Sequence, residues 1–167
     1  MKLILLITMF VALFVGTTQA KASRYIKQIH HYQKETWKWQ HLMGVQKTHA
    51  GHTAERSKSA TYRRWVRDLW LRRAYNAWKE AQNPPHESGW LCIHRYEGAW
   101  TDSGSPYYGG LQMDLGFQRT YGGFLLYRKG TANRWSPLEQ MWVAERAFRS
   151  GRGYYPWPNT ARYCGLI

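Results

Sequence analysis

The stretch between Trp90 and Met113 constrains the fold of this chain most strongly, because an apolar segment there ends in a carboxylate followed at once by a glycine. Trp90, Ile93 and Glu97 recur at i, i+3 and i+7 and therefore share one face of a helix. Gly98 can adopt the positive φ that ends such a helix. The pattern predicts a helix with Glu97 in its last turn and apolar side chains on the same face.

Glu97 is the main candidate for chemistry, since aromatic residues surround it in the sequence. A carboxyl group in an apolar pocket has a raised pKa and can keep its proton at neutral pH, as a general acid must. Residues 101–106 are turn formers. Residues 107–113 are expected to form a short strand or extended segment, in which Gly109 and Gly110 allow a polymer to approach the backbone.

This part of the chain resembles the transglycosylase-like domain of bacterial resuscitation-promoting factors, a family with the lysozyme-like fold, over about residues 86–167. The matching positions are a tryptophan seven residues before the glutamate, a tryptophan after it and a Tyr-x-Gly-Gly-Leu-Gln run: Trp90, Glu97, Trp100, Tyr107, Gly109, Gly110, Leu111 and Gln112. The family has a cysteine directly before its glutamate, where this chain has Tyr96. Cys92 lies one helical turn earlier, on the same face as Tyr96.

The resemblance implies that a single carboxyl group, that of Glu97, protonates a glycosidic oxygen and then acts as a base toward water or a sugar hydroxyl. The first route yields a reducing end, and the second yields an anhydro-sugar. Six residues are expected to contact the substrate: Trp100, Asp102, Tyr107, Tyr108, Gly110 and Gln112. Gln112 and Tyr107 match positions that line the groove in the family.

A glycosidase usually needs two carboxylates, and the second one is not obvious in this sequence. Asp102 and Asp114 are the candidates by sequence distance from Glu97. Asp102 lies among turn formers, and Asp114 directly follows the predicted strand. Their simpler interpretations are therefore a turn former and a helix cap.

The chain has two cysteines, Cys92 and Cys164. An even count in a secreted protein fits one disulfide, with two buried free thiols as the alternative. The resemblance supports the bridge, because the tail from Trp157-Pro158 to Cys164-Gly165 is similar to the end of the family domain. On the chain-entropy model, closing a loop of this length contributes roughly 4 kcal/mol.

Residues 1–20 have the pattern of a secretory signal. Lys2 gives a positive start, Leu3 to Val15 is an apolar run, and Ala20 is a small residue suited to cleavage. The alternative is a retained membrane anchor, although a span needs about 20 apolar residues and this run is shorter. The mature protein is expected to begin near Lys21 and to be secreted and associated with the cell wall.

Positive charge is concentrated before Pro84-Pro85. Residues 21–85 hold 14 Lys or Arg against 4 Asp or Glu, whereas residues 86–167 hold 9 against 6. The first segment also contains few glycines or prolines until Pro84. This change in composition places the predicted domain border at residue 85.

The basic segment is predicted to contain two helices, at residues 22–43 and 61–81, with Gly44 ending the first. Residues 45–60 are polar, show no periodicity and are interpreted as a flexible linker. In the second helix Val66, Trp70, Ala74 and Trp78 repeat every four residues.

Arginines cover much of the rest of the second helix, and two interpretations of it stay open. The helix packs on a partner through its tryptophan stripe, or it adheres to an anionic wall polymer or membrane surface. A nucleic-acid partner is disfavoured by the secretory signal.

Further helix signals lie in the second half of the chain. A short helix is expected at residues 115–121 and is expected to stop at Gly122-Gly123. Ser136, Pro137 and Glu139 form a strong helix start of the capping-box type. The five histidines before residue 85 lack metal-ligand spacing, and no phosphate loop or nucleophile motif is present, so no metal or cofactor is predicted.

The sequence therefore predicts a secreted, mainly helical α+β protein: a lysozyme-like catalytic domain at residues 86–167 preceded by a basic helical extension at residues 21–85. The predicted activity is cleavage of peptidoglycan glycan strands by a monomeric enzyme that uses Glu97. The extension is a candidate for contact with anionic wall polymers. The alternatives are a non-catalytic protein for wall binding or signalling, and a cationic membrane-active protein.

Overall fold

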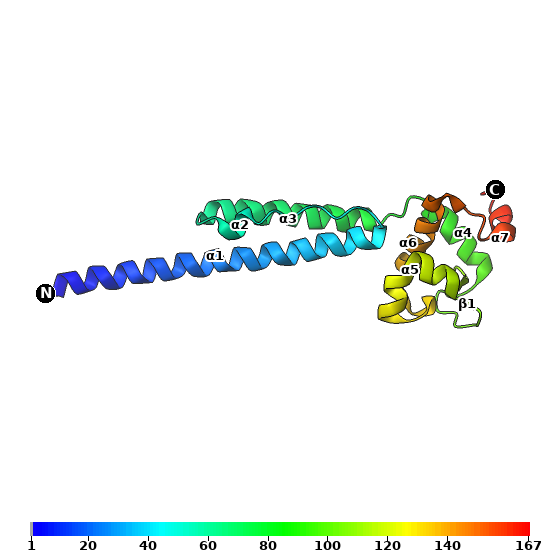
Figure 1. The fold of residues 1–167 in the computed structure, drawn as a ribbon, viewed down its shortest axis with the longest axis horizontal. Coiled ribbons are helices and arrows are strands. Elements are labelled where there is room, and N and C mark those ends of the chain that lie inside the picture. Colours follow the sequence, from blue (N-terminus) through cyan, green and yellow to red (C-terminus); the bar gives the residue numbers. More distant parts are fainter. Residues whose placement is uncertain (1) are drawn as a thin grey trace. The chain divides into compact units, whose positions relative to one another are not determined.

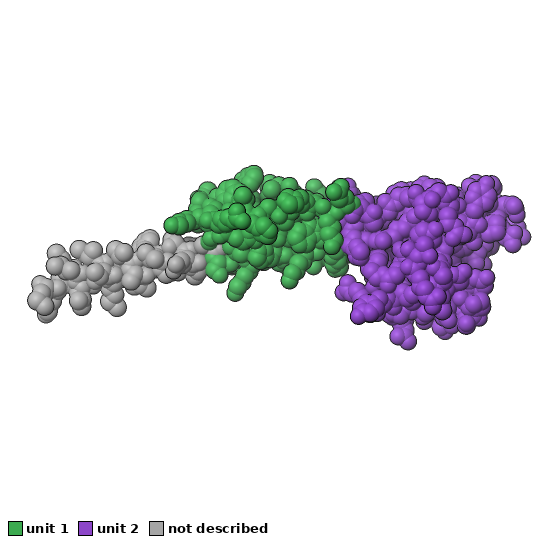
Figure 2. Space-filling view, viewed as in Figure 1, with its two compact units in different colours: residues 1–39, 46–79 green, residues 40–45, 80–167 purple. Residues whose placement is uncertain are grey.

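The computed structural model describes residues 2–167, with side chains from Ser23 onward. The predicted signal segment, residues 1–20, lies outside the part with described side chains. The chain is mainly helical with one small two-stranded sheet, which confirms the predicted mainly helical α+β class. It divides into two compact units, residues 1–39 with 46–79 and residues 40–45 with 80–167 (Figure 2). Within residues 23–167, no helix is long and apolar enough to cross a membrane.

Unit 1 is built from most of α1 (Lys2–Met43), α2 (Thr53–Arg56) and most of α3 (Ala60–Ala81), so both predicted helices of the basic segment are present. The chain returns along the helices between α1 and α2, so α1 and α3 run in the same direction (Figure 1). The helices meet through a buried apolar cluster composed of Ile29, Ala54, Val66 and Trp70. Val66, Trp70 and Ala74 of the four-residue repeat in α3 are buried and mark the face that packs inside unit 1, whereas Trp78 is exposed.

The segment predicted as a flexible linker, residues 45–60, is instead packed onto unit 1. It contains α2, and Ala54 on that helix is buried. The indole Nε1 of Trp37 donates a hydrogen bond to the carbonyl of Thr48 at 2.8 Å, and His30 bonds Glu55 at 2.9 Å. The His30 bond holds the pKa of Glu55 below its ordinary value. Polar side chains fix this segment, which is why it shows no apolar periodicity.

Unit 2 begins its main part with α4 (Glu87–Glu97), then a hairpin of β1 (Tyr107–Tyr108) and β2 (Met113–Asp114). Helix α5 (Leu115–Lys129), a 3₁₀ turn at Ala132–Arg134 and α6 (Pro137–Ala147) follow, and the chain ends with a π turn at Phe148–Arg152 and α7 (Pro158–Tyr163). Its core comprises Trp90, Ile93, Leu111, Met113, Leu125, Ala132, Trp135, Met141, Val143, Ala144, Tyr154, Trp157 and Ala161.

Several local signals in this unit are confirmed. Gly98 ends α4 with φ +151°, and Ser136 and Glu139 form the reciprocal bonds of a capping box at the start of α6. The sulfur atoms of Cys92 and Cys164 are joined, which confirms the predicted disulfide. These features depend on residues close to one another in sequence, except for the disulfide, where only two cysteines were available to pair.

Two predicted elements differ from the structure. The short strand or extended segment expected at residues 107–113 is part of a hairpin, in which Tyr107 pairs with Asp114 and Tyr108 with Met113. The stop expected at Gly122-Gly123 is confirmed only in part, because the helical angles are interrupted at Gly122 (φ −127°, ψ 20°) but the chain resumes a helix after this kink and α5 reaches Lys129. A Cβ atom at Gly122 would lie 2.7 Å from the Trp135 ring. That glycine therefore provides room for a tryptophan at the kink.

The end of α1 and the two residues after it, 40–45, belong to unit 2, which therefore extends beyond the predicted range of 86–167. Leu42 and Met43 are buried. The guanidinium of Arg146 donates to the carbonyls of His41 and Leu42, and that of Arg149 donates to the carbonyl of Met43. Cationic side chains at a helix C-terminus satisfy its free carbonyls and complement its dipole.

Candidate active site

Glu97 lies in a surface cleft of about 270 Å³. It is the last residue of α4 and is half-buried, while Trp90 and Ile93 on the same helix are fully buried. The cleft is lined by Glu97, Tyr107, Gln112 and the run Pro156-Trp157-Pro158-Asn159-Thr160. The predicted helix face thus anchors α4 in the core and leaves the carboxyl group at an opening. The lining is mixed, with aromatic and proline rings beside four polar side chains.

Thr160 is the direct partner of the candidate acid. Its hydroxyl donates a hydrogen bond to Oε1 of Glu97. Thr160 lies on α7, and Cys164, which follows that helix, is joined to Cys92 on α4. The indole of Trp157 also donates to the carbonyl of Leu111 at 2.6 Å, and this bond holds the start of α7 against the hairpin. The disulfide and this bond together bring the end of the chain to Glu97.

Gln112 connects the cleft to a second carboxylate. Its amide donates to Oδ2 of Asp102 at 2.7 Å and to the carbonyl of Gly109 at 3.0 Å. Gln112 has a φ of +45°, a conformation uncommon for a residue with a side chain. A Cβ atom at Gly98 would lie 3.3 Å from both the Asp102 carboxylate and the Gln112 amide. Asp102 therefore lies beside the residue that follows Glu97.

The two aspartates that were candidates for a second carboxylate have different surroundings. Oδ1 of Asp114 accepts a hydrogen bond from the Phe117 amide at 2.7 Å, and this is the N-cap of α5. Asp102 also has a local role, because its Oδ1 accepts from the Gly104 amide at 2.9 Å. Asp102 differs in that its other oxygen is bound to a residue that lines the cleft. It is therefore the better candidate.

Three of the six expected substrate-binding residues, Trp100, Tyr108 and Gly110, have packing roles. The Trp100 ring stacks on His94 with centroids 3.9 Å apart, and Trp100 and Tyr108 pack against the core. Gly110 lies beneath the stacked rings, since a Cβ atom there would be 2.5 Å from His94 Nδ1. Tyr107 and Gln112 line the cleft, whereas these three support the hairpin that carries them.

Gln140 on α6 also supports the hairpin, and the sequence did not indicate it. This fully buried residue accepts from the Gly110 amide at 2.9 Å and donates to the Trp100 carbonyl at 2.8 Å. Its amide also donates to the carbonyls of Ala132 and Trp135. One buried side chain thereby satisfies four backbone groups from separate segments, as buried backbone groups require.

The buried carboxylate of Glu145 is hydrogen-bonded to the first part of α4 and to the residue before it. Glu145 on α6 is fully buried, and its Oε1 accepts from the His86 amide and from the Trp90 indole, both at 2.8 Å. His86 Nδ1 lies 3.1 Å from Oε2. Burial, followed by the charge of Glu145, raises the pKa of the nearby Tyr154. In the sequence Glu145 shares a helix face with apolar residues, which was the only signal of its burial.

No protein-family model matches the chain, and no curated protein or solved structure shows significant similarity to it. Within residues 23–167, no group of three or more His, Cys, Asp or Glu side chains is arranged to hold a metal ion. The walls of the cleft carry carboxyl, amide, hydroxyl and phenol groups.

Proposed function

We propose that the protein is a secreted enzyme that cleaves the glycan strands of peptidoglycan, with a lysozyme-like catalytic unit and Glu97 as its acid and base. The observation that carries this proposal is a carboxyl group at a helix end, in an open cleft bordered by Tyr107 and Gln112. Aromatic and amide side chains on the walls of a groove suit sugar rings, whose faces are apolar and whose edges carry hydroxyls.

In this mechanism Glu97 donates its proton to the glycosidic oxygen as the bond to the anomeric carbon breaks. The hydrogen bond from Thr160 to Oε1 fixes the orientation of the carboxyl group and leaves Oε2 for the transferred proton. The carboxylate then removes a proton either from a water molecule or from a hydroxyl group of the same sugar. Asp102, held by Gln112, contributes negative charge beside the developing oxocarbenium ion.

The first experiment compares Glu97→Gln with Glu87→Gln on purified cell wall. Both variants lose one carboxylate from α4, but Glu87 is exposed in the first turn and outside the cleft. Removal of a general acid typically lowers the rate by about 10²–10⁴-fold. We expect that loss for Glu97→Gln and near-normal lysis for Glu87→Gln. Comparable lysis by a folded Glu97→Gln protein would contradict the proposal.

Product analysis by mass spectrometry separates the two chemical routes. Hydrolysis adds one water to each cleaved strand, whereas attack by the internal hydroxyl gives an anhydro-sugar end that is lighter by that mass. Asp102→Asn is the informative variant, because it keeps the shape of the side chain and removes its charge. A selective loss of the hydrolytic product in Asp102→Asn would assign Asp102 to water activation. Loss of both products would assign it to charge stabilisation.

A binding role for unit 1 is supported by its exposed surface. Trp65, Tyr75 and Trp78 on α3 are exposed, and basic residues alternate with them along the helix. Such a mixture of cationic and aromatic side chains favours anionic polymers or interfaces. In the proposed function, unit 1 retains the enzyme at the anionic wall, and the enzyme acts as a monomer outside the cell.

A further inference from the structure

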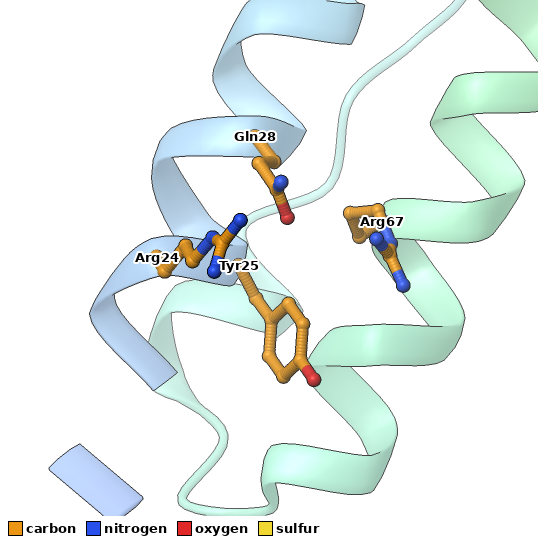
Figure 3. Close-up of a pocket in the computed structure, with 4 residues that line it drawn as sticks. All are labelled: Arg24, Tyr25, Gln28 and Arg67. Atoms are coloured by element: carbon orange, nitrogen blue, oxygen red, sulfur yellow. The ribbon is translucent and has the colours of Figure 1, made fainter. Parts of the chain in front are cut away.

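A second cavity lies within unit 1, between α1 and α3. It has a volume of about 320 Å³ and is lined by Arg24, Tyr25 and Gln28 from α1 and by Arg67 from α3. Figure 3 shows these four side chains around the space between the two helices. The guanidinium of Arg67 lies over the Tyr25 ring, 5.4 Å from its centroid. The tyrosine therefore holds one arginine in place at the edge of the cavity.

Two buried polar atoms of these lining side chains have no hydrogen-bond partner. They are Oε1 of Gln28 and Nε of Arg67. Nε of Arg67 lies 2.7 Å from the carboxylate of Asp68. The two groups form an ion pair, but their geometry does not meet the angle of a hydrogen bond. Buried polar groups in folded proteins are almost always bonded, either to the protein or to something that it binds. Two such atoms in the walls of one cavity therefore point to an occupant.

The donors around the cavity define the chemistry of that occupant. Arg24 and Arg67 can only donate hydrogen bonds, and Tyr25 can donate through its hydroxyl. Gln28 can also present its NH₂ group inward, because rotation of the amide exchanges its oxygen and nitrogen. A ligand with several acceptor oxygens satisfies all four residues at once. Asp68 offsets one of the two positive charges at the cavity.

The surrounding charge favours an anion. From Ser23 to the end of α1 there are four Lys or Arg and one Glu, and α3 has six Lys or Arg against two acidic residues. Arginine forms paired hydrogen bonds with phosphate and carboxylate groups, and phosphate offers more acceptor oxygens to converging donors. A cavity of about 320 Å³ has room for a phosphate group with a small alcohol attached.

We propose that the cavity between α1 and α3 binds a phosphate ester group through Arg24, Arg67, Tyr25 and Gln28. This gives unit 1 a ligand site of its own and does not rest on the proposed activity at Glu97. A phosphate ester can come from a soluble ester, from a wall polymer linked by phosphodiesters or from a lipid headgroup. The chemistry that the site recognises is the same in each case.

The test uses the full chain and glycerol 3-phosphate, with binding measured by isothermal titration calorimetry at low salt. Arg67→Gln and Arg24→Gln each remove one cavity charge, and Arg64→Gln is the matched control, an exposed arginine on α3 outside the cavity. Loss of a charge-assisted hydrogen bond is expected to weaken binding about tenfold or more. The control is expected to change affinity by less than about twofold, because an exposed charge acts at a distance and is screened.

Gln28→Met provides an independent readout, since it removes the polar group without changing the charge. Arg24 is exposed, so Arg24→Gln also keeps the test valid if Arg67→Gln disturbs the contact with Tyr25. Equal loss in all three arginine variants would overturn the proposal. So would the absence of measurable binding by the unaltered protein both to glycerol 3-phosphate and to phosphatidylglycerol vesicles.

Vesicles containing phosphatidylglycerol and a solution of inorganic phosphate distinguish the sources of the ligand. Vesicle binding that depends on Arg24 and Arg67, with no effect of the soluble ester, would assign the site to lipid headgroups. Competition by glycerol 3-phosphate but not by inorganic phosphate would assign it to the ester itself. Vesicle binding that is equally strong in both cavity variants and in Arg64→Gln would show charge attraction without a site and would overturn the proposal.

Discussion

Replacing Glu145 by alanine should destabilise unit 2 strongly, and replacing it by glutamine should not. The carboxylate is fully buried and is bonded to the His86 amide and the Trp90 indole through one oxygen, Oε1. Alanine leaves the buried indole donor and the amide without partners, at a cost of about 1–3 kcal/mol for each. Loss of the contact between the His86 ring and Glu145 costs less free energy, because the ring is partly exposed and can form a hydrogen bond with water. Together with the cavity, the expected loss in unfolding free energy is about 3–5 kcal/mol.

Glutamine keeps the shape of Glu145 and can place its carbonyl oxygen at the position of Oε1. Both 2.8 Å bonds are then preserved. Its NH₂ group meets His86 Nδ1, which accepts a hydrogen bond in one neutral tautomer. The expected loss for Glu145→Gln is therefore about 1 kcal/mol or less.

The two units can unfold separately, so the measurement must report on α4 itself. Hydrogen exchange of peptides covering α4, followed by mass spectrometry, gives the opening free energy of that helix in the full chain. Urea unfolding followed by near-ultraviolet circular dichroism provides a second reading. A cost below about 1 kcal/mol for Glu145→Ala, or an equal cost for both variants, would refute the reasoning.

Three further predictions follow from contacts in unit 2. Gly110→Ala places a Cβ atom 2.5 Å from His94, so thermal unfolding should show a loss of about 1–3 kcal/mol. The Cys92–Cys164 bridge spans 72 residues. Its reduction should lower the melting temperature, because the unfolded chain gains conformational entropy worth roughly 4 kcal/mol when the loop is opened. Burial and Glu145 raise the pKa of Tyr154. The phenol of Tyr154 therefore contributes stability fully below the ordinary tyrosine pKa, and this contribution is lost as the pH rises above it. Tyr154→Phe removes the titrating group, so the fall in melting temperature above about pH 10 should be flatter in that variant.

The sequence predicted elements whose signals are local. The capping box at Ser136, the glycine end of α4 and the periodic face of α3 each depend on residues within a few positions of one another. Gly122 interrupts the helix as predicted, but the helix resumes after this kink, and the contact of Gly122 with the Trp135 ring left no local signal in the sequence. The packed segment 45–60 was missed because the bonds of Trp37 and His30 hold it, and such bonds leave no periodic pattern.

The candidate site was predicted in part for the same reason. Glu97, Tyr107 and Gln112 are in or near one motif, and all three line the cleft. Thr160 was not predicted, since it lies 63 residues from Glu97 and reaches it only through the folding of α7. Gln140 was missed because its function is to satisfy backbone groups from three segments, which no spacing along the sequence encodes.

The residues that make up unit 2 are discontinuous along the chain, and this affects how that unit can be isolated. Residues 40–45 are separated from the rest of the unit by the 34 residues 46–79. A fragment that starts at residue 86 lacks the carbonyls that Arg146 and Arg149 bind, and also the Ala81 carbonyl that accepts from the Trp142 indole at 2.7 Å. Trp142 and the two guanidinium groups would then face water or remain unpaired. Expression of residues 40–167 keeps every residue of unit 2, with the α2 and α3 segment retained as an internal insertion, and is therefore the better starting fragment for crystallisation and enzymology.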